Sequence, residues 1–249
     1  MKKYKKKQWI YWLLTIVILA VLGMVFRYFG PRGPGREGEG IVSGECISPM
    51  EQGFALEQIP PYTGSPYYEV NNNIPYFKVG DYPGEAFEIY SDLDFLGRCG
   101  VTIARVCREL MPTGEREPIG AVKPTAWHYT KYDFVNGKYL YNRCHLIGFQ
   151  LTGENANERN LITGTRYMNV EGMLPFENQI AEYVHSTGGA VLYRVTPCFR
   201  GKDLLAQGVL LEALSLEDEA EGVCFNVFCY NVQPGVEIDY ATGDNRLVP

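Results

Sequence analysis

The chain has 249 residues, of which 46% are hydrophobic and 21% are charged, values close to those of an average globular protein. These proportions exclude a chain that is disordered throughout and a protein that crosses a membrane many times. The formal net charge is −6, but residues 1–30 contain six basic and no acidic side chains, so residues 31–249 carry a net charge of about −12. Such an acidic domain argues against nucleic-acid binding unless the basic groups gather locally.

The first distinct segment, residues 8–26, contains no charged side chain and is long enough to cross a bilayer as a helix. Five lysines precede it, and aromatic residues lie at its first edge, where they favour the membrane interface. The positive-inside rule then keeps the N-terminus in the cytoplasm and exports the rest of the chain. A cleaved signal peptide is the alternative, although its apolar region is usually shorter. We therefore expect a basic tail and transmembrane anchor at residues 1–29, followed by an extracytoplasmic domain, which would be secreted if the helix is cleaved.

Residues 30–80 are expected to be a linker followed by an irregular segment. Glycine, proline and charged residues dominate residues 30–45, and such a composition cannot bury a core. Five prolines interrupt residues 46–80 and exclude a long helix there.

From residue 81 to residue 249 the pattern predicts an α+β domain around an antiparallel sheet. Residues 86–90 and 100–107 resemble strands, and residues 121–125 and 138–142 resemble short extended pieces. A helix is predicted for residues 175–186 because apolar side chains recur there at helical spacing after a proline. Three strands forming an antiparallel meander are predicted at residues 190–199, 203–216 and 222–232.

Two residue types bear on chemistry. The seven cysteines include no C-x-x-C pair, which gives little support to a zinc cluster and leaves a disulfide open. Of the three histidines, we expect His128 to pack among aromatic residues and His185 to bind carbonyls at the end of the predicted helix. His145 differs because it directly follows a short strand and lies near Arg143 and several downstream asparagines and arginines.

The segment around His145 resembles the active-site segment of the DNA/RNA non-specific endonucleases, and bacterial DNA-entry nucleases are the most similar group. This family has the ββα-metal, or His-Me finger, fold. Its Asp-Arg-Gly-His hallmark reads Asn142-Arg143-Cys144-His145 here, and a metal-position asparagine, Asn169, follows 24 residues after the histidine. Glu177 comes eight residues later on the predicted helix. The similarity extends over about residues 85–245 and includes the C-terminal segment.

The resemblance implies a role for each of these side chains. Neutral His145 is the expected general base for water, because histidine titrates near neutrality. Asn169 is the expected ligand of a Mg²⁺ ion, with Mn²⁺ as a substitute, and Glu177 would bind the metal directly or through water. Arg143 and Arg166 are the expected phosphate-binding side chains. Asn160 is expected to brace the loop or to orient a neighbouring side chain. The substitutions at Asn142 and Cys144 leave the orientation and pKa of the histidine open, and Cys144 as a nucleophile is an alternative.

The sequence thus predicts a membrane-anchored, extracytoplasmic, Mg²⁺-dependent endonuclease that cuts DNA, with RNA as a further candidate substrate and no evident protein partner. A catalytically weak nucleic-acid receptor for DNA uptake on the same fold is the main alternative. A surface interaction module with no nucleic-acid role is the third hypothesis, favoured by the acidic net charge. We expect this charge to be offset by a local basic patch comprising Arg143, Arg159, Arg166, Lys123 and Lys131.

Overall fold

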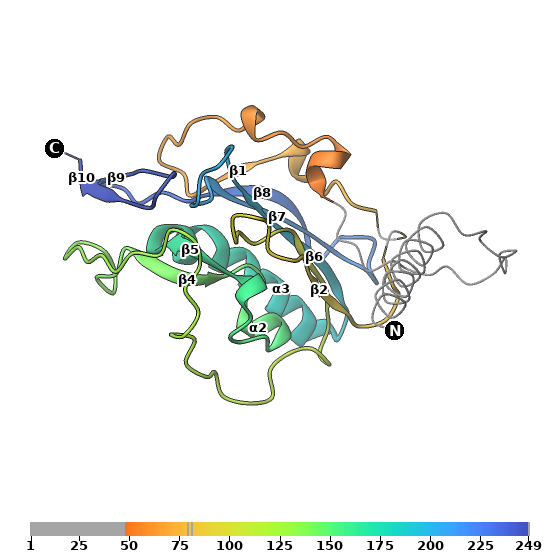
Figure 1. Cartoon of the computed structure of the whole chain (residues 1–249). Helices are drawn as coiled ribbons and strands as arrows, with labels where there is room; N and C mark the ends of the chain where they lie inside the picture. Colours follow the sequence, from red (N-terminus) through yellow and green to blue (C-terminus); the bar gives the residue numbers. More distant parts are fainter. Residues whose placement is uncertain (1–47, 79, 81, 249) are drawn as a thin grey trace, which may run out of the picture. The chain divides into compact units, whose positions relative to one another are not determined.

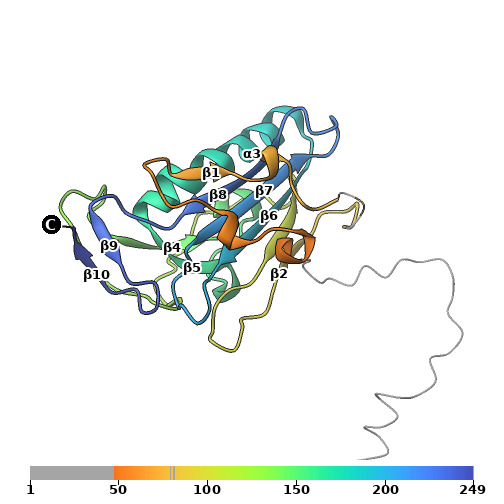
Figure 2. The same ribbon diagram turned by 90° about the horizontal axis from the view of Figure 1, so that it is seen from above.

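The computed structural model describes residues 48–78, 80 and 82–248, and its largest element is a six-stranded antiparallel sheet. Across the sheet the strands are β1 (Tyr67–Glu69), β8 (Cys224–Tyr230), β7 (Gly208–Ser215), β6 (Val191–Cys198), β3 (Thr102–Val106) and β2 (Glu88–Tyr90) (Figure 2). The predicted meander is confirmed, because β6 pairs with β7 and β7 with β8 through consecutive hairpins.

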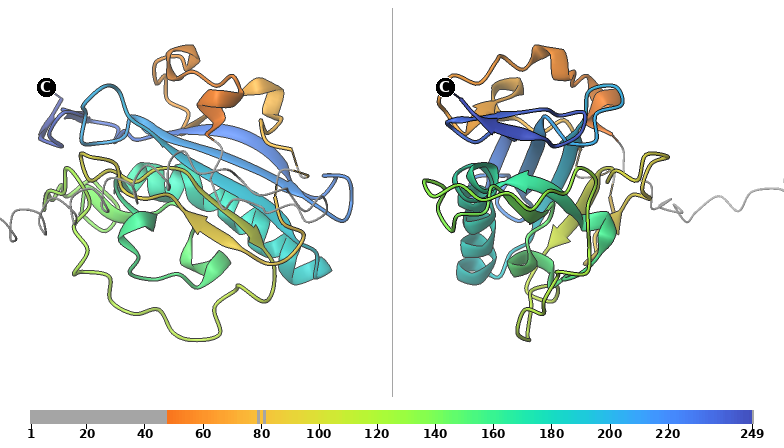
Figure 3. Two further views of the ribbon diagram at one scale, coloured as in Figure 1. Left: turned by 45° about the vertical axis from the view of Figure 1, so that its right-hand side comes forward. Right: turned by 60° about the vertical axis from the view of Figure 1, so that its left-hand side comes forward.

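One face of the sheet is covered by a layer that contains the ββα unit. This unit consists of the strand pair β4 (Tyr141–His145) and β5 (Leu161–Thr165) followed by helix α3 (Leu174–Thr187) (Figures 1 and 3). The short helix α2 (Phe149–Thr152) lies in the loop between the two strands. Apolar side chains from the sheet, from β4 and β5 and from both helices form the main core; they include Cys144, Leu151, Ile162, Ile180, Tyr193 and Val227.

Helix α3 agrees with the helix predicted for residues 175–186. It carries Pro175 in its first turn and ends at Gly188, whose φ of 73° is in the left-handed region that favours glycine. A π-helical turn, Met168–Met173, leads directly into α3. Single π turns inside helices are frequent at functional sites, and this one carries Asn169.

The opposite face of the sheet is covered by residues 48–78 (Figure 1). This segment contains three short 3-10 turns, Pro49–Gln52, Leu56–Gln58 and Asn71–Asn73, and the strand β1, which pairs with β8. It is therefore largely irregular, as expected, yet it adds an edge strand to the sheet.

A fully buried ion pair joins this segment to the sheet. Arg194 on β6 donates two hydrogen bonds to the carboxylate of Glu212 on β7, at 2.7 and 2.9 Å. Arg194 also donates to Gln52, and the backbone N–H of Tyr76 donates to Glu212. Removing either partner of such a pair leaves a buried charge uncompensated, which is strongly destabilising.

The remaining elements are loops and one small hairpin. Residues 121–125, expected to be extended, form a turn and loop, while β9 (Val236–Ile238) and β10 (Asn245–Leu247) form a two-stranded hairpin that the pattern did not predict. Asn231, just after β8, binds β5 to the sheet: it accepts from Thr165 N–H at 2.8 Å and donates to Thr163 C=O at 3.2 Å.

The membrane prediction concerns the part of the chain before residue 48, and the disulfide question concerns the cysteines. The expected membrane segment, residues 8–26, lies outside the described residues, and among the described ones no helix is long and apolar enough to cross a bilayer. The six cysteines within the described residues carry free thiols, so the structure shows no disulfide among them.

Candidate active site

A cavity of about 230 Å³ lies where β4, α2, the π-helical turn and α3 meet, and we call it the catalytic cavity. Nine residues line it: Arg116, Arg143, His145, Gly148, Phe149, Gln150, Asn169, Leu174 and Glu177. Four of the residues predicted from sequence therefore share one cavity, although they are spread over 35 positions of the chain, from Arg143 to Glu177.

His145, the last residue of β4, is held in one tautomer by its neighbours. Its Nε2 lies 2.8 Å from the backbone carbonyl of Asn155, which can only accept, so Nε2 carries the proton. Nδ1 therefore holds the lone pair, and the guanidinium of Arg116 donates to it at 3.1 Å. Burial lowers the pKa of His145 to about 4, and the charge of Arg116 contributes in the same direction while the Asn155 carbonyl opposes it. At neutral pH the ring is an uncharged proton acceptor.

Glu177 enters the cavity from the first turn of α3 and is 8% exposed. Burial raises its pKa to about 7, against the opposing effects of the Gly148 N–H bond and the Arg116 charge. A Cβ at Gly148 would lie 2.8 Å from either carboxylate oxygen, so a larger residue at this position would force the carboxylate to move. A carboxyl with a pKa this close to neutrality, placed in a cleft, is typical of functional sites.

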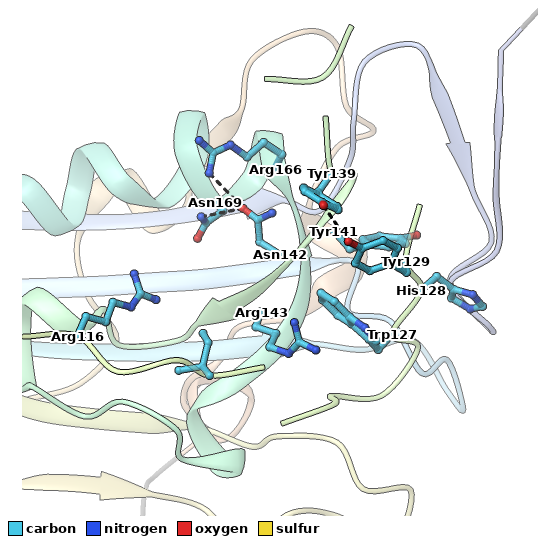
Figure 4. A pocket seen from close by; sticks show the side chains of 11 residues that line it. Arg116, Trp127, His128, Tyr129, Tyr139, Tyr141, Asn142, Arg143, Arg166 and Asn169 are labelled. Carbon is cyan, nitrogen blue, oxygen red and sulfur yellow. Dashed lines mark hydrogen bonds between the residues drawn. The ribbon is translucent and has the colours of Figure 1, made fainter. Parts of the chain in front are cut away.

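Asn169 projects from the π-helical turn between two neighbours on β4. Its Oδ1 accepts a hydrogen bond from the Cys144 thiol at 3.0 Å, and its Nδ2 donates to Asn142 Oδ1 at 3.3 Å (Figure 4). Burial and the nearby charge of Glu177 raise the pKa of the Cys144 thiol far above neutrality, so it is a donor here. A protonated, buried thiol is a poor nucleophile, which argues against the Cys144 alternative.

The predicted basic patch forms only in part. Arg143 lines the cavity, but its guanidinium donates to the carbonyls of Gly120 and Val122 and lies 4.0 Å from the Trp127 ring centroid. Arg166 binds Asn142 Oδ1 at 3.4 Å and lines a neighbouring cavity. Arg159 and Lys123 line neither of these two cavities: Asp92 pairs with Arg159 at 2.9 Å, and Lys123 lines a separate cavity together with Glu158.

Asn160 lies behind the catalytic cavity rather than on its surface. It is fully buried, accepts from the N–H of Ile147 and donates to the C=O of the same residue, both at 2.9 Å. These two bonds hold the chain between His145 and Gly148, so the structure favours the bracing role of Asn160 over contact with a substrate.

The sequence interpretation missed Arg116, which contacts His145 and lines the catalytic cavity. It lies 29 residues before His145 in a loop without strand or helix periodicity, and no local pattern distinguishes it from other surface arginines. The carbonyls at the end of α3, which His185 was expected to bind, instead accept from Arg108, while Gly188 N–H also binds Val184 C=O.

A second cavity, of about 370 Å³, adjoins the catalytic cavity, and we call it the aromatic cavity (Figure 4). Arg116, Arg143 and Asn169 line both, so the two cavities share part of their wall. The other lining residues come mainly from residues 127–142 and include Trp127, His128, Tyr129, Tyr139, Tyr141 and Asn142. His128, expected to pack among aromatic residues, lines this cavity, and its Nε2 lies 2.9 Å from the Thr242 carbonyl.

An antiparallel sheet bearing a ββα unit, with histidine, asparagine and glutamate in one cavity, defines a nuclease. A model of the DNA/RNA non-specific endonuclease family matches residues 80–216, more than half of the chain, and the chain belongs to this family. It is therefore an endonuclease, a hydrolase of phosphodiester bonds, as the resemblance implied.

Solved structures agree with this assignment. NucA from Streptococcus agalactiae is 27% identical to this chain in its magnesium-bound form, with a TM-score of 0.66 over 75% of this chain and 88% of that one. Its metal-free form gives the same identity and TM-score over 78% and 92%. The Sda1 nuclease, solved with a bound zinc ion, shares the fold at 22% identity and a TM-score of 0.60, over 74% of this chain and 97% of that one.

Proposed function

We propose that this protein is a Mg²⁺-dependent endonuclease that cuts DNA, and RNA as a further substrate, without sequence preference. The observation that carries the proposal is the catalytic cavity, where neutral His145, Asn169 and Glu177 face one space. Arginine contacts to phosphate carry no base information, which is consistent with cutting at many sequences. Membership of a nuclease family favours this proposal over the receptor hypothesis.

His145 is proposed as the general base. Nδ1 would take a proton from the attacking water as the water oxygen bonds to phosphorus, and Nε2–H stays on the Asn155 carbonyl and fixes the ring. The P–O bond to one sugar oxygen breaks in the same displacement, and the leaving oxygen takes its proton from solvent water. In the free protein Arg116 occupies Nδ1, so the base is covered. A phosphate oxygen offers Arg116 a charged acceptor, and charge-assisted hydrogen bonds are stronger than the bond to a neutral imidazole. We propose that substrate draws Arg116 away from Nδ1 and thereby exposes the base.

The residues present suit a hard divalent cation. The catalytic cavity offers an amide oxygen from Asn169 and a carboxylate from Glu177, and Mg²⁺ favours oxygen ligands while keeping several waters. Among the residues that the structure describes, no group of three or more His, Cys, Asp or Glu side chains could hold a metal alone. Asn169 and Glu177 would therefore hold Mg²⁺, or Mn²⁺ as a substitute, together with water and substrate phosphate. When bound, the ion would neutralise charge that develops on the phosphate and the leaving oxygen.

We also propose that residues 8–26 anchor the protein in the cell membrane with residues 30–249 outside, or that the domain is secreted if the helix is cleaved. The support is the uncharged 19-residue run behind five lysines. Full-length protein should fractionate with membranes, and external protease should digest its C-terminal domain in intact cells. Recovery of residues 31–249 exclusively from the cytosol would contradict this proposal.

The decisive experiment is plasmid nicking with the purified protein, with and without chelator. EDTA should abolish cutting while DNA binding partly survives, because the arginines remain. Asn169→Ala should lose nearly all cleavage, since it removes an amide oxygen that no other asparagine in the catalytic cavity can replace. Asn169→Asp keeps an oxygen and should retain part of the activity, and Glu177→Ala should be less damaging than Asn169→Ala if Glu177 acts through metal-bound water. Undiminished cutting in EDTA, or wild-type activity of a folded Asn169→Ala, would refute the metal assignment.

A further inference from the structure

The aromatic cavity carries exposed rings that the catalytic proposal leaves without a role. Tyr129 is 71% exposed and Tyr139 is 36% exposed, and both rings line the cavity beside the indole of Trp127 (Figure 4). The cavity shares the side chains of Arg116, Arg143 and Asn169 with the catalytic cavity. Whatever occupies it therefore lies next to the group being hydrolysed.

These rings are fixed in place before any ligand arrives. The hydroxyls of Tyr129 and Tyr139 are 2.8 Å apart, and their ring centroids are separated by 5.1 Å with the planes steeply inclined. Next to these tyrosines, backbone bonds join Leu140 to Thr130 and Tyr132 to Lys138, which makes a hairpin of this segment.

The base of the hairpin is anchored in a small core of its own. Leu140 is fully buried and Tyr141 is 3% exposed, and both pack against Leu205. The Tyr141 hydroxyl also donates to the Gly243 carbonyl at 2.8 Å. A surface that is already ordered loses little conformational entropy when a ligand binds.

Positive charge surrounds the exposed rings. The ammonium of Lys131 lies 4.6 Å from the Tyr139 centroid and 5.8 Å from the Tyr129 centroid. Arg166 lines the same cavity, and Arg143 covers the Trp127 ring at 4.0 Å. Aromatic faces alternating with cations are the combination by which proteins bind unpaired nucleic-acid strands, since bases stack on the rings while phosphates meet the cations.

We infer that the aromatic cavity is a nucleobase subsite, which takes an unstacked base of the strand being cut, adjacent to the scissile phosphate. The inference rests on the proposed function and specifies its substrate. The volume of about 370 Å³ falls within the range of small-ligand pockets. Stacking tolerates every base because each has a π face, so the subsite is compatible with cutting at any sequence. A base inside an intact duplex is not free to stack on Tyr129, so the enzyme favours single-stranded or distorted strands.

The test compares two oligonucleotides with identical phosphates. Full-length protein in EDTA is titrated with fluorescein-labelled dT10 and with a labelled decamer in which every residue is abasic, and binding is followed by fluorescence anisotropy. Tyr129→Ala/Tyr139→Ala should weaken dT10 binding by about 5- to 150-fold, the usual range for one stacked base, and leave the abasic decamer within twofold. Tyr129→Phe/Tyr139→Phe keeps both rings and should stay within threefold of wild type. Phe95→Ala removes an 86% exposed ring outside both cavities and should have no effect.

Equal loss of dT10 and abasic binding in the alanine variant, or no loss of either, would overturn the inference. If the double variant does not fold, the single Tyr129→Ala, at a largely exposed side chain, gives the same comparison. Cleavage in Mg²⁺ separates this inference from the proposed function: the alanine variant should cut dT10 with a raised KM, whereas Phe95→Ala should cut dT10 like wild type. A wild-type protein that shows the tyrosine-dependent preference for dT10 but never cuts would keep the subsite and reject the nuclease.

Discussion

Replacing Glu177 with glutamine should stabilise the metal-free protein at pH 8 while it damages cleavage. Burial raises the pKa of this carboxyl to about 7, against an ordinary value of 4.5. Because the folded-state pKa is the higher one, the contribution of Glu177 to stability is complete below about pH 4.5 and is lost as the pH rises through 7. The ionised carboxylate then costs about 3 kcal/mol of unfolding free energy at pH 8, and under about 1 kcal/mol at pH 5. Glutamine keeps the volume and an acceptor for Gly148 N–H without the charge.

Urea unfolding in EDTA at both pH values measures this difference. The Glu177→Gln variant should gain up to about 3 kcal/mol at pH 8 and much less at pH 5, whereas Glu182→Gln, at an exposed position of the same helix, should change stability by less than about 0.5 kcal/mol. Saturating Mg²⁺ should stabilise wild type more than the variant, since a metal that binds only the folded state stabilises it by mass action. A variant that is less stable than wild type at pH 8, or equally stabilised at both pH values, would refute the reasoning.

Three further predictions concern the same cavity. His145→Ala should lower kcat by about 10²–10⁴-fold in a nicking assay, the usual worth of a general base, while His185→Ala should cut like wild type; unchanged activity of the His145 variant would remove the mechanism. Arg116→Ala should lower kcat/KM by about 10- to 100-fold through loss of a charged hydrogen bond, and NMR titration should show a raised His145 pKa because a neighbouring positive charge is gone; an unaltered pKa would contradict the contact. Duplex binding should show a slope of log K against log salt no steeper than about −4, because four basic side chains lie in or beside the cavities: Arg116, Arg143, Arg166 and Lys131. A slope steeper than about −6 would refute this count.

Local patterns in the sequence were sufficient for the longest strands and for the longest helix. The meander β6–β7–β8 and helix α3 follow from apolar periodicity and from glycine and proline signals, which act within a few residues. Strand β1 was missed because it has only three residues, all exposed, and owes its strand conformation to pairing with β8 some 160 positions later.

The candidate site was predictable where its residues follow one motif and not elsewhere. His145, Asn169 and Glu177 keep the spacing of the family, and they meet in one cavity because β4 pairs with β5, which leads through the π-helical turn into α3. Arg116 contacts His145 from an irregular loop. Arg159 forms an ion pair with Asp92, which lies 67 positions away in the chain. Such contacts depend on tertiary packing, and no local sequence pattern predicts them. The membrane anchor stays a prediction.

The residues proposed for hydrolysis and those proposed for base binding lie in separate segments, and this separation has an evolutionary consequence. The groups proposed to perform hydrolysis lie between Asn142 and Glu177, apart from Arg116, whereas the aromatic wall is built from residues 127–141. Insertions or replacements in that hairpin could alter which strands are captured without displacing His145 or Asn169. Selection for a different nucleic-acid substrate could therefore act on this one hairpin, while the catalytic residues stay the same.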